Sequence, residues 1–159
     1  MVAFESALDM KGTYHAVKYF FDKKYPIIKR KSGIWGNVSS VALDGMPKQQ
    51  SHINNVENRM VDHSIYAGAI YAIHYAIAGC TDISQKIIKQ RFINGLEVYK
   101  IREIIGVYGH TTCDKKIRIA ACEFADCIDP SCDRFKVPED IIPNLHVYID
   151  DTEKPPSRS

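Results

Sequence analysis

Seven polar side chains between positions 110 and 118 have the types and spacing of a surface that binds a polyanion. They are His110, Thr111, Thr112, Asp114, Lys115, Lys116 and Arg118. Lysine and arginine neutralise phosphates or reach guanine edges in the major groove, and a threonine hydroxyl at a helix N-terminus can meet phosphate oxygens. The same composition is found on the solvated face of an ordinary helical hairpin. The residues alone therefore leave two interpretations open, a DNA-contacting surface or a solvated one.

Positively charged residues are concentrated around this group. The sequence of 159 residues has a net charge of only +2, but residues 85–118 contain eight bases against three acids. Residues 11–31 form a second basic block, with seven bases against one acid. Clustered positive charge is expected where a protein meets nucleic acid. The cations predicted to flank the surface and contact the DNA backbone are Lys86, Lys89, Arg91, Lys100 and Arg102.

Two consecutive helices would position the polar group. Apolar residues repeat at the helical period in residues 97–105, and Gly106 ends that helix. A second helix begins near Thr111 or Thr112, has an apolar seam at steps of three and four residues, and should end at Asp129-Pro130. The seam consists of Cys113, Ile117, Ala120, Phe124 and Cys127. Two helices joined by so short a segment predict a helix-turn-helix, whose second helix enters the major groove.

The rest of the chain predicts further helices and two irregular segments. A short amphipathic helix begins after Asp9 and should end near Tyr25, because Pro26 disfavours helical angles in the residue before it. Further helical patterns cover residues 55–78 and 83–93. We therefore divide the chain into an N-terminal helical arm (1–31), a linker (32–54), a helix-turn-helix DNA-binding domain (55–128) and an irregular, partly disordered tail (129–159).

Composition and cysteine pattern argue against several other classes of protein. Hydrophobic residues make up 45% of the chain and charged residues 25%, values typical of a soluble globular protein. No apolar run approaches the roughly 18 residues of a membrane span, so we expect no membrane partner. Five cysteines without a C-x2-C pair favour reduced thiols in a cytoplasm and argue against a zinc site. No phosphate-binding glycine loop or nucleophile motif is present, so we expect neither an enzyme nor a cofactor.

Several apolar and glycine positions follow the pattern of a known family. The pattern has an aromatic residue closing one helix, a glycine turn, an Ile-x-x-Ile helix and a Phe-Ala pair late in the last helix. These positions are Phe92, Gly95, Ile101, Ile104, Ile105, Gly106, Ala120, Phe124 and Ala125. Met46-Pro47 and Glu57 extend the likeness over roughly residues 44–127. The chain resembles the bacteriophage late-gene transcription regulators of the autolysin-regulator (ArpU) type, which in turn resemble region four of sigma factors.

The resemblance implies sequence-specific binding to double-stranded DNA near phage or prophage genes, with RNA polymerase as a further partner. The chain departs from the family pattern at Gly109-His110, where the family has a polar cap, and at Arg102, where it has a small residue. Which residues enter the groove is therefore open by one or two positions.

We expect a mostly α protein, a helical bundle ending in a helix-turn-helix with a short irregular C-terminal tail. Its expected function is transcription regulation, in late-gene or lysis and packaging control. The alternative is a helical assembly protein similar to a phage small terminase subunit. Oligomeric state separates the two, because a packaging ring has many subunits whereas a regulator is a monomer or a homodimer.

Overall fold

Helices dominate the structure. The computed structural model describes residues 8–34 and 54–149, except for the side chains of 54–62, and this part of the chain is mostly α, as predicted. The elements are α2 (Met10–Tyr19), η1 (Phe20–Lys24), α3 (Tyr25–Ser32), α4 (Asn54–Ala78), α5 (Asp82–Ile87), η4 (Ile88–Ile93), α6 (Val98–Ile105) and α7 (His110–Phe135), of which η1 and η4 are π-helical. Within the described ranges no strand forms, and an isolated antiparallel bridge joins Leu8 to Tyr148. No described helix has the length and hydropathy needed to cross a membrane.

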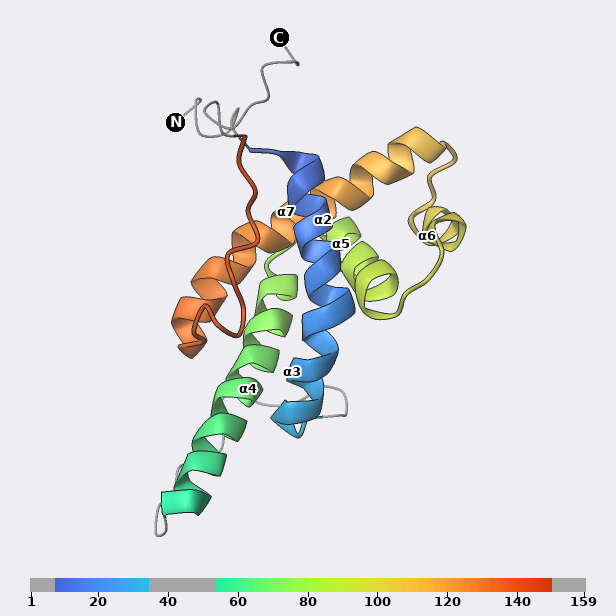
Figure 1. Ribbon diagram of the computed structural model, residues 1–159. Helices are drawn as coiled ribbons and strands as arrows, with labels where there is room; N and C mark the ends of the chain where they lie inside the picture. The colour runs from blue at the N-terminus through green and yellow to red at the C-terminus, as the bar shows by residue number, and fades with distance from the viewer. Residues whose placement is uncertain (1–7, 35–53, 150–159) are drawn as a thin grey trace.

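The longest helix, α7, is the element around which the others pack (Figure 1). It contacts α2, α4, α5 and α6 along its length. Its predicted apolar seam is confirmed, because Cys113, Ile117, Ala120 and Phe124 are all buried and Cys127 is half-buried. The core of the molecule therefore follows one face of α7.

The N-terminal helix does not end near Tyr25, and the prediction that it would is wrong. α2, η1 and α3 follow one another without a break, and the helical run ends at Gly33, which has a φ of 74°. The backbone N–H of Tyr25 bonds to the carbonyl of Phe20, five residues back, in the wider π-helical turn of η1. Pro26 has no N–H to give and its ring crowds the preceding turn. The π-helical turn directly before Pro26 lets the helix continue past it.

The predicted N-terminal arm packs into the common core. Val17, Phe20 and Phe21 are buried in the same hydrophobic cluster as residues from α4, α5 and α7. The ring of Phe21 lies 5.0 Å from that of Phe124, measured between centroids. Such aromatic contacts contribute beyond simple burial. α2 is therefore held in a fixed position beside α7.

The helices predicted for residues 55–78, 83–93 and 97–105 are confirmed as α4, α5 with η4, and α6. Gly79, after α4, permits a close approach to α7, because a Cβ there would lie 3.1 Å from the Sγ of Cys127. The turn predicted at Asn94-Gly95 is also present, with Gly95 at a φ of 74°.

The last helix continues through Pro130, contrary to the prediction that Asp129-Pro130 would end it. α7 runs to Phe135 and stops at Lys136, which has a φ of 57°. Pro130 lies on the exposed side, whereas the ring of Phe135 lies 6.2 Å from the ring of Tyr71 on α4. Packing of this last turn against α4 offsets the roughly 3 kcal/mol that an interior proline costs a helix.

The residues after α7 are irregular, as predicted, and fold back on the helices. Val137, Ile142 and Leu145 are buried in the main cluster. The backbone N–H of Asp9 donates to the carbonyl of Val147 at 2.8 Å, which ties the tail to the start of α2. The disorder predicted for the end of the tail, and most of the predicted linker, lie outside the described residues.

Candidate nucleic-acid interface

The first half of α7 presents its polar side chains outside a narrow apolar seam. Figure 1 shows this half projecting from the body beside α6. His110, Thr111, Thr112, Asp114 and Lys115 are exposed, and Lys116 and Arg118 are half-buried. The two seam positions between them, Cys113 and Ile117, are 0% and 3% exposed. The structure therefore places all seven predicted residues within the first three turns of one helix.

The N-terminus of α7 is uncapped by any described side chain. Gly109 occupies the cap position in an extended conformation and has no side chain that could cap the helix. The first turn contains no acidic residue. Backbone N–H groups at the start of a helix have no partner within the helix and carry partial positive charge. The start of α7 therefore adds to the positive potential of its cationic side chains.

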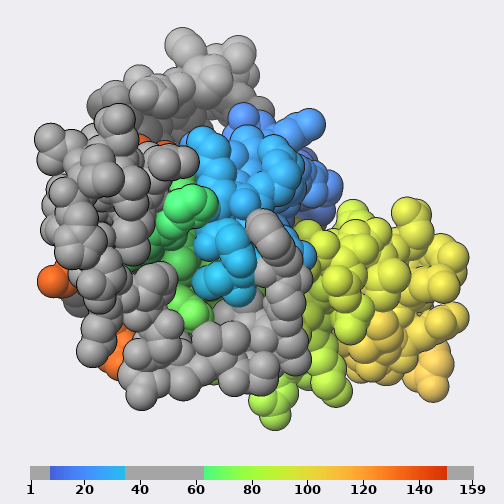
Figure 2. All heavy atoms as spheres, turned by 90° about the horizontal axis from the view of Figure 1, so that it is seen from below, coloured from blue at the N-terminus to red at the C-terminus, as the bar shows by residue number. Residues whose placement is uncertain are grey.

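α6 and a four-residue connection fix the direction in which α7 begins. Gly106 takes a φ of 73°, and its N–H bonds to the carbonyl of Arg102 at 2.9 Å. Ile101 is fully buried and anchors α6 to the core. In Figure 1 α6 is seen almost end-on while α7 runs across the view, so the two axes are far from parallel. In the space-filling view of Figure 2, η4, α6 and the start of α7 form a lobe at one side of the molecule.

Two of the predicted flanking cations are engaged with turns of their own chain. Nη1 of Arg91 donates to the carbonyl of Leu96 at 2.9 Å, and Nη1 of Arg102 donates to the carbonyl of Tyr108 at 3.3 Å. Both side chains are half-buried, and their Nε atoms are buried without a hydrogen-bond partner. These arginines therefore stabilise the segments on either side of α6. The other three predicted flanking cations, Lys86, Lys89 and Lys100, are exposed.

Lys89 belongs to a second, smaller group of positive charge. The pKa of His74 is lowered, first by burial and then by the neighbouring charges of Lys89 and Lys29. Lys29 is a residue of α3, so a cation of the N-terminal basic block and one of the later block act on the same imidazole. The two basic blocks of the sequence thus meet in the fold.

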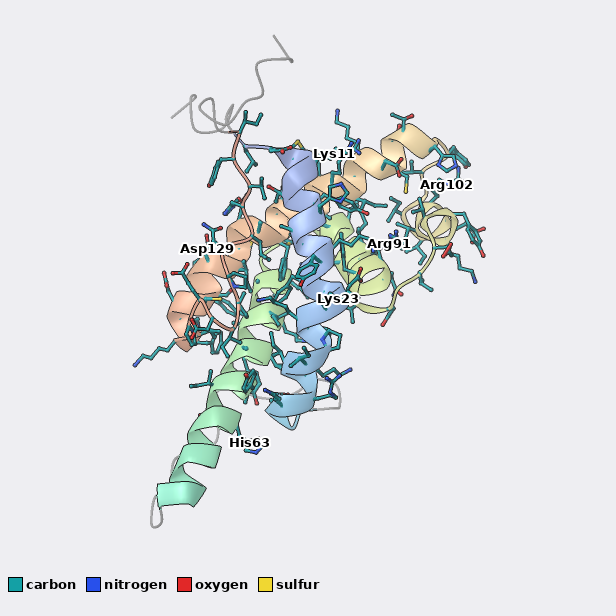
Figure 3. All side chains as sticks on the ribbon, in the orientation of Figure 1. Lys11, Lys23, His63, Arg91, Arg102 and Asp129 are labelled. Atoms are coloured by element: carbon teal, nitrogen blue, oxygen red, sulfur yellow. The ribbon has the colours of Figure 1, made fainter. Side chains whose placement is uncertain are left out.

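Three residues beside the first half of α7 were missed at the sequence level. Lys11 and His15 of α2 line the same hollow as Arg118, and Lys11 is labelled in Figure 3 at the start of α2, next to α7. Tyr108 lies in the connection before α7 and is 96% exposed. The run of charge around Lys11 was visible in the sequence, but nothing in the sequence placed it beside α7.

The second half of α7 is acidic and holds the tail. Nε2 of His146 lies 2.7 Å from Oδ1 of Asp126, and its Nδ1 lies 3.5 Å from Oδ2 of Asp129. Burial raises the pKa of the Asp129 carboxyl, as do the charges of Asp133 and Asp126, whereas His146 lowers it. Negative charge is therefore concentrated at the end of α7 away from the candidate interface.

The cysteines have the properties of packed thiols. Burial raises the pKa of Cys80 to about 12 and the pKa values of Cys122 and Cys132 to about 11. Cys132 falls in the segment predicted to be an irregular tail, but it lies half-buried within α7. Among the described residues, no group of three or more His, Cys, Asp or Glu side chains is arranged to hold a metal ion.

Comparisons with known proteins add no relative to this description. A scan against protein-family models found no match, and neither the curated proteins nor the solved structures that were searched match the chain. The resemblance to phage late-gene regulators therefore stays a prediction from the sequence, and the functional argument depends on the geometry of α6 and α7.

Proposed function

We propose that this protein binds double-stranded DNA sequence-specifically, with α6 and α7 acting as a helix-turn-helix. The observation that carries the proposal is the first half of α7, which exposes hydroxyl, imidazole and cationic side chains and buries only its seam. In such a unit the first helix braces the second, and the second inserts its N-terminal residues into the major groove.

The dimensions of this half of α7 suit the groove. An α-helix with its side chains is about 10–12 Å across. The major groove of B-DNA is about 12 Å wide. Residues in the first two turns can therefore reach base edges while the third turn comes level with the flanking phosphates. In this proposal Lys115 contacts a guanine edge or a phosphate, and the Thr111 hydroxyl contacts a phosphate oxygen.

Three exposed lysines on α5, η4 and α6 add positive charge outside α7. Lys86, Lys89 and Lys100 are exposed, and cations of this kind give binding that does not depend on base sequence. Tyr108, in the connection before α7, can donate a hydrogen bond from its hydroxyl to a phosphate. Sequence reading would then come from α7, and most of the affinity from the charges around it.

A transcription regulator of phage or prophage genes is the role that fits this activity and the family resemblance. Contact with RNA polymerase and pairing with a second copy on adjacent half-sites belong to the same proposal. No observation on the described residues favours the packaging alternative.

Fluorescence anisotropy across a salt series tests the proposal. The purified chain is titrated into a labelled random duplex and into labelled fragments from around its own gene. We expect the logarithm of the affinity to fall linearly with the logarithm of salt concentration, by about 0.9 per phosphate contacted, and one fragment to bind more tightly than the random duplex. Absence of binding to any duplex at low salt would contradict the proposal.

A further inference from the structure

A hollow of about 250 Å³ lies where the start of α2 meets the first half of α7. Lys11 and His15 line it from α2, Asp114 and Arg118 from α7, and Val98 and Ile117 contribute apolar surface. The two helices are about 100 residues apart in the sequence, so the fold alone brings these cations together. The hollow adjoins the helix that we propose enters the groove.

The packing of α2 fixes the direction of its two basic side chains. Thr13 and Val17 are fully buried on the inner face of α2, and the ring of Tyr14 lies 6.0 Å from the ring of Phe92. Residues four apart lie on the same side of a helix, so Lys11 and His15 share the exposed side next to Arg118. Their position relative to α7 is thus set by a buried contact.

The cations of the hollow are not used within the described part of the chain. None of Lys11, His15 and Arg118 forms an ion pair with a described carboxylate. Lys18, two turns after Lys11 on α2, is different because its Nζ lies 2.8 Å from Oδ2 of Asp22. A lysine in the first turn of a helix is also unfavourable for the helix dipole. The stability of α2 therefore gives no reason for a lysine at position 11.

We infer that this hollow receives a backbone phosphate of duplex DNA, bound by Lys11 and His15 of α2 together with Arg118 of α7. The inference depends on the proposed function and extends the interface from the helix-turn-helix to the N-terminal helix. Arg118 is on the third turn of α7, level with the strand that borders the groove, and Lys11 lies beside it. Asp114, one turn earlier on the same side of α7, also lines the hollow, so the three cations there face one carboxylate as well as the phosphate.

The test compares two lysines of the N-terminal helical run in the full-length protein. Lys11→Ala removes a cation of the hollow, and Lys23→Ala removes an exposed cation from η1, three turns further along the same run (Figure 3). Both variants lose one charge and no buried contact, so circular dichroism and thermal melting should match the parent. Binding to the duplex preferred by the parent protein is measured by anisotropy across a salt series.

We expect Lys11→Ala to weaken binding about three- to tenfold near 0.1 M salt and to reduce the salt slope by about one, as the loss of one phosphate contact predicts. His15→Ala should weaken binding by a smaller factor. Lys23→Ala should change neither quantity. Equal affinities and slopes for Lys11→Ala and Lys23→Ala would overturn the inference. If Lys115→Ala still weakens binding in that case, the proposed function stands without this site, whereas no duplex binding by the parent overturns both.

Discussion

The two halves of α7 differ in burial and charge although they form one continuous helix. The first half, residues 110–118, buries only a narrow seam and exposes its polar side chains. The second half, residues 120–135, is enclosed by neighbouring elements and contributes most of the helix's buried positions. These are Ala120, Ala121, Cys122, Phe124, Ala125, Ile128 and Ser131. Because the helix is unbroken, the core that fixes the second half also fixes the direction of the first.

The charges of α7 are divided between its two halves. Lys115, Lys116 and Arg118 lie in the first half with one acid, Asp114. The second half contains four acids, Glu123, Asp126, Asp129 and Asp133, against one base, Arg134. This division places positive charge on the projecting end, which is what an anionic partner requires.

The largest expected effect is on stability, from a change in the second half of α7. Phe124 is fully buried and its ring lies near those of Phe20 and Phe21. Phe124→Ala removes these contacts and leaves a cavity, so the free energy of unfolding should fall by about 3–5 kcal/mol, measured by urea denaturation. A loss below about 1 kcal/mol would mean that the core does not follow this face of α7.

A smaller effect is expected where the acidic half of α7 holds the tail. The side chain of His146 is 11% exposed and bonds to Asp126. His146→Ala should lower the free energy of unfolding by roughly 1–2 kcal/mol, because a hydrogen bond to a charged group and the packing of the half-buried imidazole are lost. Asp126→Asn keeps the shape of the acceptor and should cost less. Equal stability of His146→Ala and the parent would show that the contact of His146 with α7 does not stabilise the position of the tail.

The smallest of the three effects is expected at the connection that sets the direction of the first half. A Cβ on Gly106 would meet no atom within 4 Å, but the φ of 73° is unfavourable for L residues. Gly106→Ala should therefore destabilise the protein by about 1 kcal/mol through backbone strain alone. Gly106→Asn should destabilise it less, since asparagine tolerates this conformation better. Thermal melting of the two variants distinguishes backbone strain from steric crowding. Crowding would lower the melting temperature of Gly106→Asn more than that of Gly106→Ala, because asparagine is larger.

The sequence predicted the helices with a clear apolar period and missed what depends on tertiary packing. The steps of three and four residues from Cys113 to Phe124 identified the buried face of α7, and Gly106 identified the turn before it. Pro26 and Pro130 were interpreted as helix ends by local rules. A π-helical turn at the first and the packing of Phe135 on α4 at the second overrode those rules.

The site was predictable only where it lies on one helix. Periodicity alone placed Lys115 and its neighbours on one exposed face. The position of Lys11 beside Arg118 depends on how α2 packs against α7, which no local pattern encodes. Arg91 and Arg102 were grouped with the exposed cations by charge, but their bonds to Leu96 and Tyr108 depend on how the chain turns around α6.

The most direct test of the central claim removes equal charge from the two ends of α7. One variant combines Lys115→Ala with Lys116→Ala, and the other combines Arg134→Ala with Lys136→Ala. Each loses two cations, and duplex binding is measured by anisotropy across a salt series. The account predicts that the first variant binds more weakly, with a salt slope reduced by up to about two, and melts like the parent, while the second keeps the parent affinity. Equal losses of affinity in both variants would show that net charge alone attracts the DNA and would contradict an interface at the start of α7.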